Sequence, residues 1–269
     1  MTVYRNQEFI FQLFALIIAL ILVHGLYVTL IRPAASAQLE AQLEREAAGE
    51  PYVAERSFYI VVKDYEQEAC FVLMLWAMAI MGYKTRLTLK ERRLLDTPMI
   101  NVSEGTRILP EDARQLARPI EALPRHQQNY LLPRALSAAL QRFSATGSIQ
   151  AVSGAVSEVC ETENERLDSE LAMVRYIAWA IPSIGFIGTV RGIGEALGQA
   201  HKAVQGDIAG VTASLGVAFN STFIALVISI VVMFLMYQLQ LIQERLVLET
   251  HSYCDRNLIR HLKHEGPTA

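Results

Sequence analysis

The sequence has few of the features on which soluble enzymes and nucleic-acid-binding proteins depend. Only 19% of its 269 residues are charged and the formal net charge is −3, and it has no basic patch interleaved with aromatic residues of the kind that binds nucleic acid. Its three cysteines, Cys70, Cys160 and Cys254, lie far apart and show no CxxC or Cys/His spacing, so neither a disulfide framework nor a zinc site is predicted. With no Walker lysine and no nucleophile–base arrangement, we expect no enzymatic activity, no cofactor and no metal site.

The sequence does contain long apolar segments. Hydrophobic residues make up 52% of the chain, and four apolar segments stand out against the roughly 20 residues that cross a bilayer. We predict an all-α polytopic membrane protein with four transmembrane helices, of which the third and fourth extend as long helices into a cytoplasmic helical bundle. The predicted parts are a first transmembrane helix at 1–31, an external loop at 32–57, a second transmembrane helix at 58–83, a cytoplasmic helical region at 84–170, the third and fourth transmembrane helices with a short external turn at 171–241, and a cytoplasmic tail at 242–269.

The orientation follows from a basic cluster directly after the second span, at 84–93. Cytoplasmic loops carry the excess of lysine and arginine, so the region after this span is predicted to be internal, and four spans then place both termini inside. A competing interpretation is a cleaved signal peptide, because Ala35-Ser36-Ala37 resembles its cleavage site. The preceding apolar run is about 23 residues, longer than the roughly 7–15 of a signal core, and this favours a retained span.

The third span carries a stripe of small residues. At the helical period, Pro182, Gly185, Gly188, Thr189 and Gly192 fall along one face of an otherwise bulky apolar helix. Such a stripe lets a helix press its backbone against another helix in lipid. The lone hydroxyl on this face is where a polar function would lie.

The fourth span repeats the pattern. Its small face is formed by Ser214, Ala218, Ser221 with Thr222, Ala225 and Ser229. Thr189 and Thr222 are 33 residues apart, which suits an antiparallel pair with both hydroxyls at similar depth. Serine and threonine also bond their own helix carbonyls, so plain helix packing remains open beside a polar pathway through Thr189, Thr222 and Ser221.

Three charged or titratable residues lie near the predicted external ends of spans. Arg191 falls off the small face and pairs by spacing with Glu195, either as an ion pair or as a gate at the external mouth. His24 lies in the outer half of the first span, where an interfacial neutral histidine and a functional group both remain open.

The pattern Gly185-x-x-Gly188-Thr189-Val190-x-Gly192, preceded by Pro182 and followed by Ala218-x-x-x-Thr222 in the next span, resembles the MotA/TolQ/ExbB proton-channel family. The resemblance covers roughly residues 175–229. The glycine that usually follows the second threonine is missing in Ser221-Thr222-Phe223-Ile224-Ala225, and four predicted spans match the MotA-like arrangement, whereas the TolQ/ExbB branch has three.

The resemblance implies a homopentamer in the bacterial inner membrane around two copies of a single-span partner similar to ExbD, TolR or MotB. The partner's membrane aspartate would carry the ion, a proton or alternatively sodium, and residues matching Thr189 and Thr222 would line the ring's inner wall. Pro182, Gly185, Gly188, Gly192, Ser214, Ala218 and Ala225 are then expected to be pore-face packing residues. Ion flow would turn the ring against its partner and do work on the cell envelope.

Two other functions remain open from the sequence: a non-conducting membrane scaffold and a stand-alone transporter. The third and fourth spans have no carboxylate in mid-membrane, which disfavours the transporter and fits a partner that supplies one. Neither the load, nor the choice between proton and sodium, nor the role of the external loop 32–57 follows from the residues.

Overall fold

The computed structural model describes residues 2–47, 57–100 and 107–263, and the regular structure within these ranges is helical. Four of its helical stretches are long and apolar enough to cross a membrane, Gln7–Gln42, Tyr65–Asp96, Ile149–Gly198 and Ala209–His261. The predicted all-α class with four membrane helices and long C-terminal helices is therefore confirmed.

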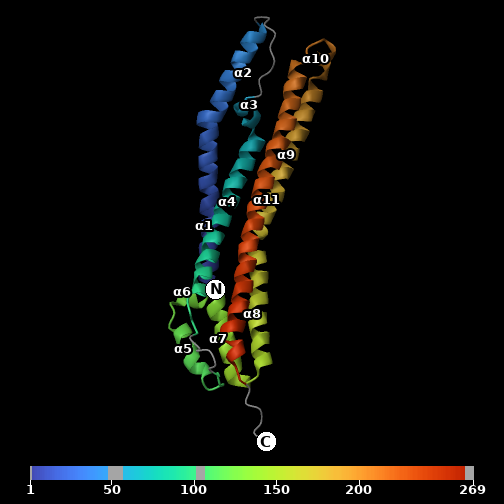
Figure 1. Ribbon diagram of the computed structural model, residues 1–269. Coiled ribbons are helices and arrows are strands. Elements are labelled where there is room, and N and C mark those ends of the chain that lie inside the picture. The colour runs from blue at the N-terminus through green and yellow to red at the C-terminus, as the bar shows by residue number, and fades with distance from the viewer. Residues whose placement is uncertain (1, 48–56, 101–106, 264–269) are drawn as a thin grey trace. The chain divides into compact units, whose positions relative to one another are not determined.

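The chain forms two compact units, Met1–Gly82 with Met173–Met236, and Tyr83–Ala172 with Tyr237–Ala269. The first unit contains α1 (Thr2–Leu26), a π-helical turn η1 (Tyr27–Ile31), α2 (Arg32–Ala47), α3 (Phe58–Val62), α10 (Ala200–Val204), and the outer parts of α4 (Tyr65–Arg92), α9 (Ala172–Gly198) and α11 (Ala209–Asn257). In Figure 1, α9 and the first part of α11 run side by side as a hairpin whose turn carries α10. This hairpin holds both small-residue faces.

In the first unit the structure shows two features that the predicted parts did not include. The chain does not become a loop at residue 32, because the first helix continues through η1 into α2 and ends only at Ala47. Residues 38–47 are mainly alanine, glutamine, leucine and glutamate, which are all good helix formers, so the helix has no local reason to stop. The remainder of the predicted loop, 48–56, lies outside the described residues.

The second span, expected as one helix over 58–83, is divided in two. α3 ends at Val62 and α4 begins at Tyr65, with Lys63 and Asp64 between them. The backbone N–H of Glu68 donates to the carbonyl of Asp64 at 3.2 Å, so Asp64 opens the new helix, as aspartate commonly does. The first turn of α4 contains Glu66 and Glu68, and both form hydrogen bonds with residues of other helices.

The apolar faces of the first unit are largely uncovered within the single chain. Phe14, Phe186, Phe219 and Ile230 are each more than half exposed, on three different helices. Continuous exposed apolar faces of this kind require lipid or a partner protein to cover them. The exposed side chains therefore agree with the membrane assignment.

The second unit surrounds a separate apolar core. It contains η2 (Arg93–Asp96), α5 (Ala113–Glu121), α6 (Arg125–Gln128), α7 (Leu131–Thr146), α8 (Ile149–Glu170) and η3 (Ile259–His261), together with the inner ends of α4 and α11. Phe143, Cys254 and Leu258 are fully buried in this core. α11 continues helically to Asn257, so much of the predicted tail 242–269 is helix, and 264–269 lie outside the described residues.

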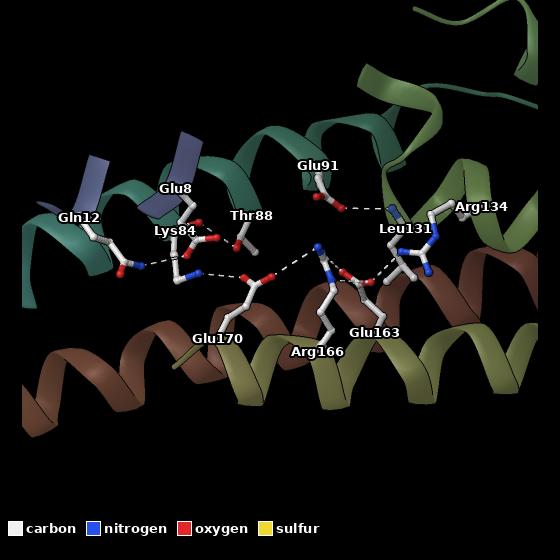
Figure 2. Close-up of polar contacts among 10 residues, drawn as sticks. All are labelled: Glu8, Gln12, Lys84, Thr88, Glu91, Leu131, Arg134, Glu163, Arg166 and Glu170. Carbon is white, nitrogen blue, oxygen red and sulfur yellow. Dashed lines mark hydrogen bonds and ion pairs between the residues drawn. The ribbon is translucent and has the colours of Figure 1, made fainter. Parts of the chain in front are cut away.

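A row of alternating charges crosses the second unit, and we call it the charge ladder. Lys84 donates to Glu170 at 2.9 Å, Arg166 lies 3.4 Å from Glu170 and also bonds Glu163, and Arg134 donates to Glu163 at 2.8 Å (Figure 2). Lys84 and Glu163 are 3% and 1% exposed, so both charges are buried and each is paired. Lys84, which we counted among the membrane-edge cations, is thus an interior ion-pair residue.

The ladder is accompanied by a helix cap from a distant segment. The carboxylate of Glu91 on α4 accepts a hydrogen bond of 3.1 Å from the backbone N–H of Leu131, the first residue of α7 (Figure 2). Carboxylates are favourable at helix N-termini, where N–H groups have no partner inside the helix. Glu91 therefore fixes where α7 begins in the second unit.

Candidate functional site

The two small-residue faces meet each other inside the first unit. A Cβ added to Gly185 would lie 2.5 Å from Cβ of Ala225, and one added to Gly188 would lie 2.5 Å from Cβ of Ser221. At Gly192 an added Cβ would lie 2.7 Å from both the carbonyl oxygen of Ser214 and the backbone nitrogen of Ala218. The glycines are required for this close approach of α9 and α11, and the small residues of α11 are the matching surface.

The two threonine hydroxyls are in contact within this hairpin. Thr189 Oγ1 and Thr222 Oγ1 form a short hydrogen bond, so the hydroxyls do lie at one depth. Thr189 Oγ1 also lies 3.3 Å from the carbonyl oxygen of Gly185 and 3.2 Å from that of Ala218, and Thr222 Oγ1 lies 3.1 Å from that of Gly185.

The threonine pair has more hydrogen-bond acceptors than protons. The two hydroxyls have two protons to donate, but they make one contact with each other and three with carbonyl oxygens. Several assignments of donor and acceptor therefore fit the same geometry. Such a group of oxygens can pass a proton between hydroxyls or offer oxygen ligands to a small cation. Both threonines are partly exposed, which leaves this group accessible from outside the chain.

Pro182 has a specific partner arrangement on α11. Because proline has no N–H, it cannot bond the carbonyl of Ala178 four residues earlier. The hydroxyl of Ser229 donates to that carbonyl at 3.2 Å and is buried. Ser229, which the sequence pattern placed on the small face of the fourth span, thus satisfies the freed carbonyl across the helix pair and is a positioning residue.

Ser221 points in a different direction from its neighbour Thr222. Its Oγ accepts a hydrogen bond of 3.3 Å from Nε2 of Gln67 on α4, and both side chains are 1% exposed. The same Nε2 lies 3.2 Å from the carbonyl oxygen of Val61, which is left free at the break between α3 and α4. The predicted pathway residue Ser221 is therefore joined to a buried amide of the second span.

Arg191 is the centre of an ion-pair group with four members. Its guanidinium contacts both carboxylate oxygens of Glu66, at 2.7 and 2.9 Å, and donates to Glu195 at 2.9 Å. Asp64, in the break outside the four candidate spans, lies 4.0 Å away, and burial raises the pKa of its carboxyl above its usual range. The structure contains the expected Arg191–Glu195 pair and adds a stronger, bidentate one with Glu66.

A second carboxylate of α4 is held by the first helix. Glu68 accepts a hydrogen bond of 2.7 Å from Nδ1 of His24 and a short one from the guanidinium of Arg32. Arg32 also stacks over the rings of Tyr27 and Tyr65. His24, whose role was open from the sequence, thus lies in a clamp around Glu68 on the side of α4 that faces α1.

The remaining predicted residues lie in the contact between α9 and α11. Ser214 accepts a hydrogen bond of 3.2 Å from Nε2 of Gln199 near the external turn. Ala218 and Ala225 are fully buried against α9. Within the described residues no group of three histidine, cysteine, aspartate or glutamate side chains could hold a metal ion.

The model of the MotA/TolQ/ExbB proton channel family matches residues 127–252. This part of the chain, just under half of the sequence, is similar to that family. No curated protein and no solved structure matches the chain.

The part of the chain that is similar to the MotA/TolQ/ExbB family contains the hairpin. The matched residues include the whole of α9, both threonines and Arg191. The family consists of membrane proton channels that work in complexes with partner proteins and is not a class of enzymes. The match begins after α4, however, so Glu66 and Gln67 lie outside it.

Sequence reasoning missed Glu66 and Gln67 for a definable reason. They lie in the outer half of the predicted second helix, and the three acidic residues within 64–68 indicate only that this half lies in water or protein. Their partners are 125 and 154 residues away in the chain, and such pairing leaves no local signal. The available clue was Asp64, a favoured helix-starting residue between two apolar runs.

Proposed function

We propose that this chain is the ring subunit of a proton-driven motor in the bacterial inner membrane. Five copies surround two copies of a single-span partner similar to ExbD, TolR or MotB, and the partner's membrane aspartate carries the ion. The observation that supports this most directly is the contact between the hydroxyls of Thr189 and Thr222 within the family-matched hairpin. Both termini are cytoplasmic in this proposal, because the basic residues after the second span mark the internal side.

In this proposal the aspartate comes from the partner, because neither hairpin helix supplies an acid at this depth. The sequence contains no aspartate or glutamate at 172–194 or at 208–243. A carboxylate in the membrane is costly when charged and therefore binds a proton or a cation where oxygen atoms are close. The hydroxyls of Thr189 and Thr222, with the carbonyls of Gly185 and Ala218, are such oxygens.

Each ion transfer changes the charge of the aspartate and hence its preferred neighbour in the ring. The neutral acid leaves one threonine pair, and after it loses its proton the charged form is attracted to the next. Five equivalent hairpins around two aspartates convert this alternation into rotation of ring against partner. The partner then carries the work to the envelope or to another assembly.

The first experiment is native mass spectrometry of the chain co-expressed with a neighbouring gene for a single-span protein that has a membrane aspartate. A complex of five chains with two partners is expected. A stable monomer or dimer that binds no such partner would contradict the proposal and favour a scaffold or a stand-alone transporter.

The second experiment measures proton flux in liposomes that contain the complex. Thr189→Val and Thr222→Val remove a hydroxyl at nearly constant volume, and both should abolish flux while the complex stays assembled. Thr189→Ser and Thr222→Ser keep the hydroxyl and are the matched controls. Loss of assembly in the valine variants, with flux per assembled complex unchanged, would assign the threonines to packing alone. Replacing the proton gradient by a sodium gradient identifies the ion.

A further inference from the structure

The structure places a carboxylate of the chain itself beside the threonine pair. A Cβ added to Gly188 would lie 3.2 Å from Cγ of Glu66, so the side chain of Glu66 lies directly over the residue that precedes Thr189. A side chain at residue 188 would have to displace Glu66 by a few tenths of an ångström, so the glycine leaves room for this approach. The glycine of the Gly-Thr sequence therefore serves α4 as well as α11.

Glu66 is bound by Arg191 in the geometry that favours a fixed pair. Both carboxylate oxygens contact the guanidinium, at 2.7 and 2.9 Å, and the Glu66 side chain is 11% exposed. Glu195 touches the same guanidinium through one oxygen and is 46% exposed. The bidentate bond makes Glu66 the principal counter-charge of Arg191.

Arg191 lies close to the route of a cation toward the threonine pair. Its guanidinium binds Glu66, whose side chain lies over Gly188, the residue next to Thr189, so the charge of Arg191 lies on the order of 10 Å from the hydroxyls. An uncompensated guanidinium at that distance repels every cation that approaches. In a partly dry site this repulsion is much stronger than in water.

We propose that Glu66 and Arg191 together set the electrostatic barrier for the permeating cation, and that Glu66 keeps this barrier low by cancelling the charge of Arg191. Glu66 is thus a specificity-determining residue for the ion route, supplied by the second span. The inference rests on the proposed channel function and adds to it a residue outside the family-matched segment.

The size of the effect follows from Coulomb's law. One unit charge at roughly 10 Å, with an effective dielectric constant of about 20, changes the rate of ion passage on the order of tenfold. Salt reduces it, because the screening length falls from about 10 Å at 0.1 M to about 3 Å at 1 M. The effect of Glu195, which is more exposed, should be smaller.

An ion pair that only holds α4 against α9 makes a different prediction. Removing either member of such a clamp loosens the same contact, so both variants would lose flux in the same direction. If instead the pair sets a barrier, removing the negative member slows cations, whereas removing the positive member does not. The sign of the two effects therefore separates the two roles.

The experiment is proton flux through the complex of this chain and its partner in liposomes, at low and at high salt. Glu66→Gln should lower flux about tenfold at low salt and by less at 1 M salt. Arg191→Gln should leave flux unchanged or raise it, and the double variant should return close to the wild type. Glu66→Asp and Arg191→Lys keep each charge, and Glu195→Gln removes the more exposed partner. All three should stay within about threefold of the wild type.

Several outcomes would overturn the inference. Equal losses in Glu66→Gln and Arg191→Gln, losses that do not depend on salt, or failure of both to assemble by native mass spectrometry would each assign the pair to packing. Absence of flux in the assembled wild-type complex would instead refute the proposed function. That result comes from the wild-type complex, whereas the inference is tested by comparing the variants with it. The two failures are therefore distinguishable.

Discussion

Gly192 and Gly194 form a matched pair for testing the close contact of α9 and α11. An alanine Cβ at Gly192 would lie 2.7 Å from the carbonyl oxygen of Ser214, 2.7 Å from the backbone nitrogen of Ala218 and 2.8 Å from its Cβ. Ordinary contacts between such atoms are about 3.5–4.0 Å, so the helices would have to separate by about 1 Å. Two of the three opposing atoms belong to the backbone and cannot rotate away.

The destabilisation caused by overpacking can be compared with the stabilisation that alanine gives to a helix. Overpacking of this kind destabilises by about 1–3 kcal/mol, and replacing a helical glycine by alanine returns up to about 1 kcal/mol. At Gly194 an added Cβ meets nothing within 4 Å, so only the gain applies. Gly192→Ala should therefore lower the melting temperature of the detergent-solubilised protein by several degrees, and Gly194→Ala should leave it unchanged or raise it.

The assay is thermal unfolding of both variants and the wild type in one detergent, followed by circular dichroism. Equal shifts for Gly192→Ala and Gly194→Ala would refute the packing argument, because the two positions share a helix and differ only in what opposes them. Size-exclusion chromatography before heating checks that all three begin in the same oligomeric state.

Two further predictions concern charges. Glu163→Gln leaves two arginines of the charge ladder without their buried counter-charge, and it should destabilise the second unit by about 1–3 kcal/mol in chemical denaturation. Glu249→Gln is the control, because the side chains of Arg92 and Glu249 are 42% and 41% exposed; it should destabilise the unit by less than about 1 kcal/mol. A similar cost for both would contradict the role of burial. Because burial raises the pKa of Asp64, the folded state holds this proton more tightly than the unfolded state and stability gains as pH falls. Asp64→Asn should therefore raise the melting temperature at pH 7 and lose this advantage below about pH 4, where aspartate is protonated in both states; an advantage that persists at low pH would refute the assignment.

The helix hairpin could be predicted because its signals are periodic and local. Glycines at 185, 188 and 192 repeat at helical spacing, and the matching small residues of the fourth span do the same, so each face could be derived from its own segment. The equal depth of Thr189 and Thr222 followed from their separation and one short turn. These inferences need no knowledge of how the rest of the chain packs.

The contacts of the second span could not be predicted in this way. A run of acids beside an apolar segment is typical of a hydrated helix end, and nothing local shows that Glu66 meets an arginine 125 residues later. Ser229 likewise looked like one more small residue, although its hydroxyl replaces the N–H that Pro182 lacks. Lys84 was assigned by charge to the membrane edge, and its burial depends on Glu170 of another helix.

The π-helical turn at Tyr27–Ile31 has a consequence for the angular phase of the first helix. His24 and Arg32 are eight residues apart, and in an unbroken α-helix this spacing leaves them about 80° apart around the axis. A π turn contains one residue more than an α-helical turn. The eight residues from His24 to Arg32 therefore rotate around the axis by about as much as seven α-helical residues, which is within about 20° of two complete turns. The wide turn thus rotates Arg32 onto the side of His24, where the two side chains can hold the two oxygens of a single carboxylate, Glu68. One extra residue in one turn is what aligns the part of the helix beyond the predicted membrane boundary with the part before it.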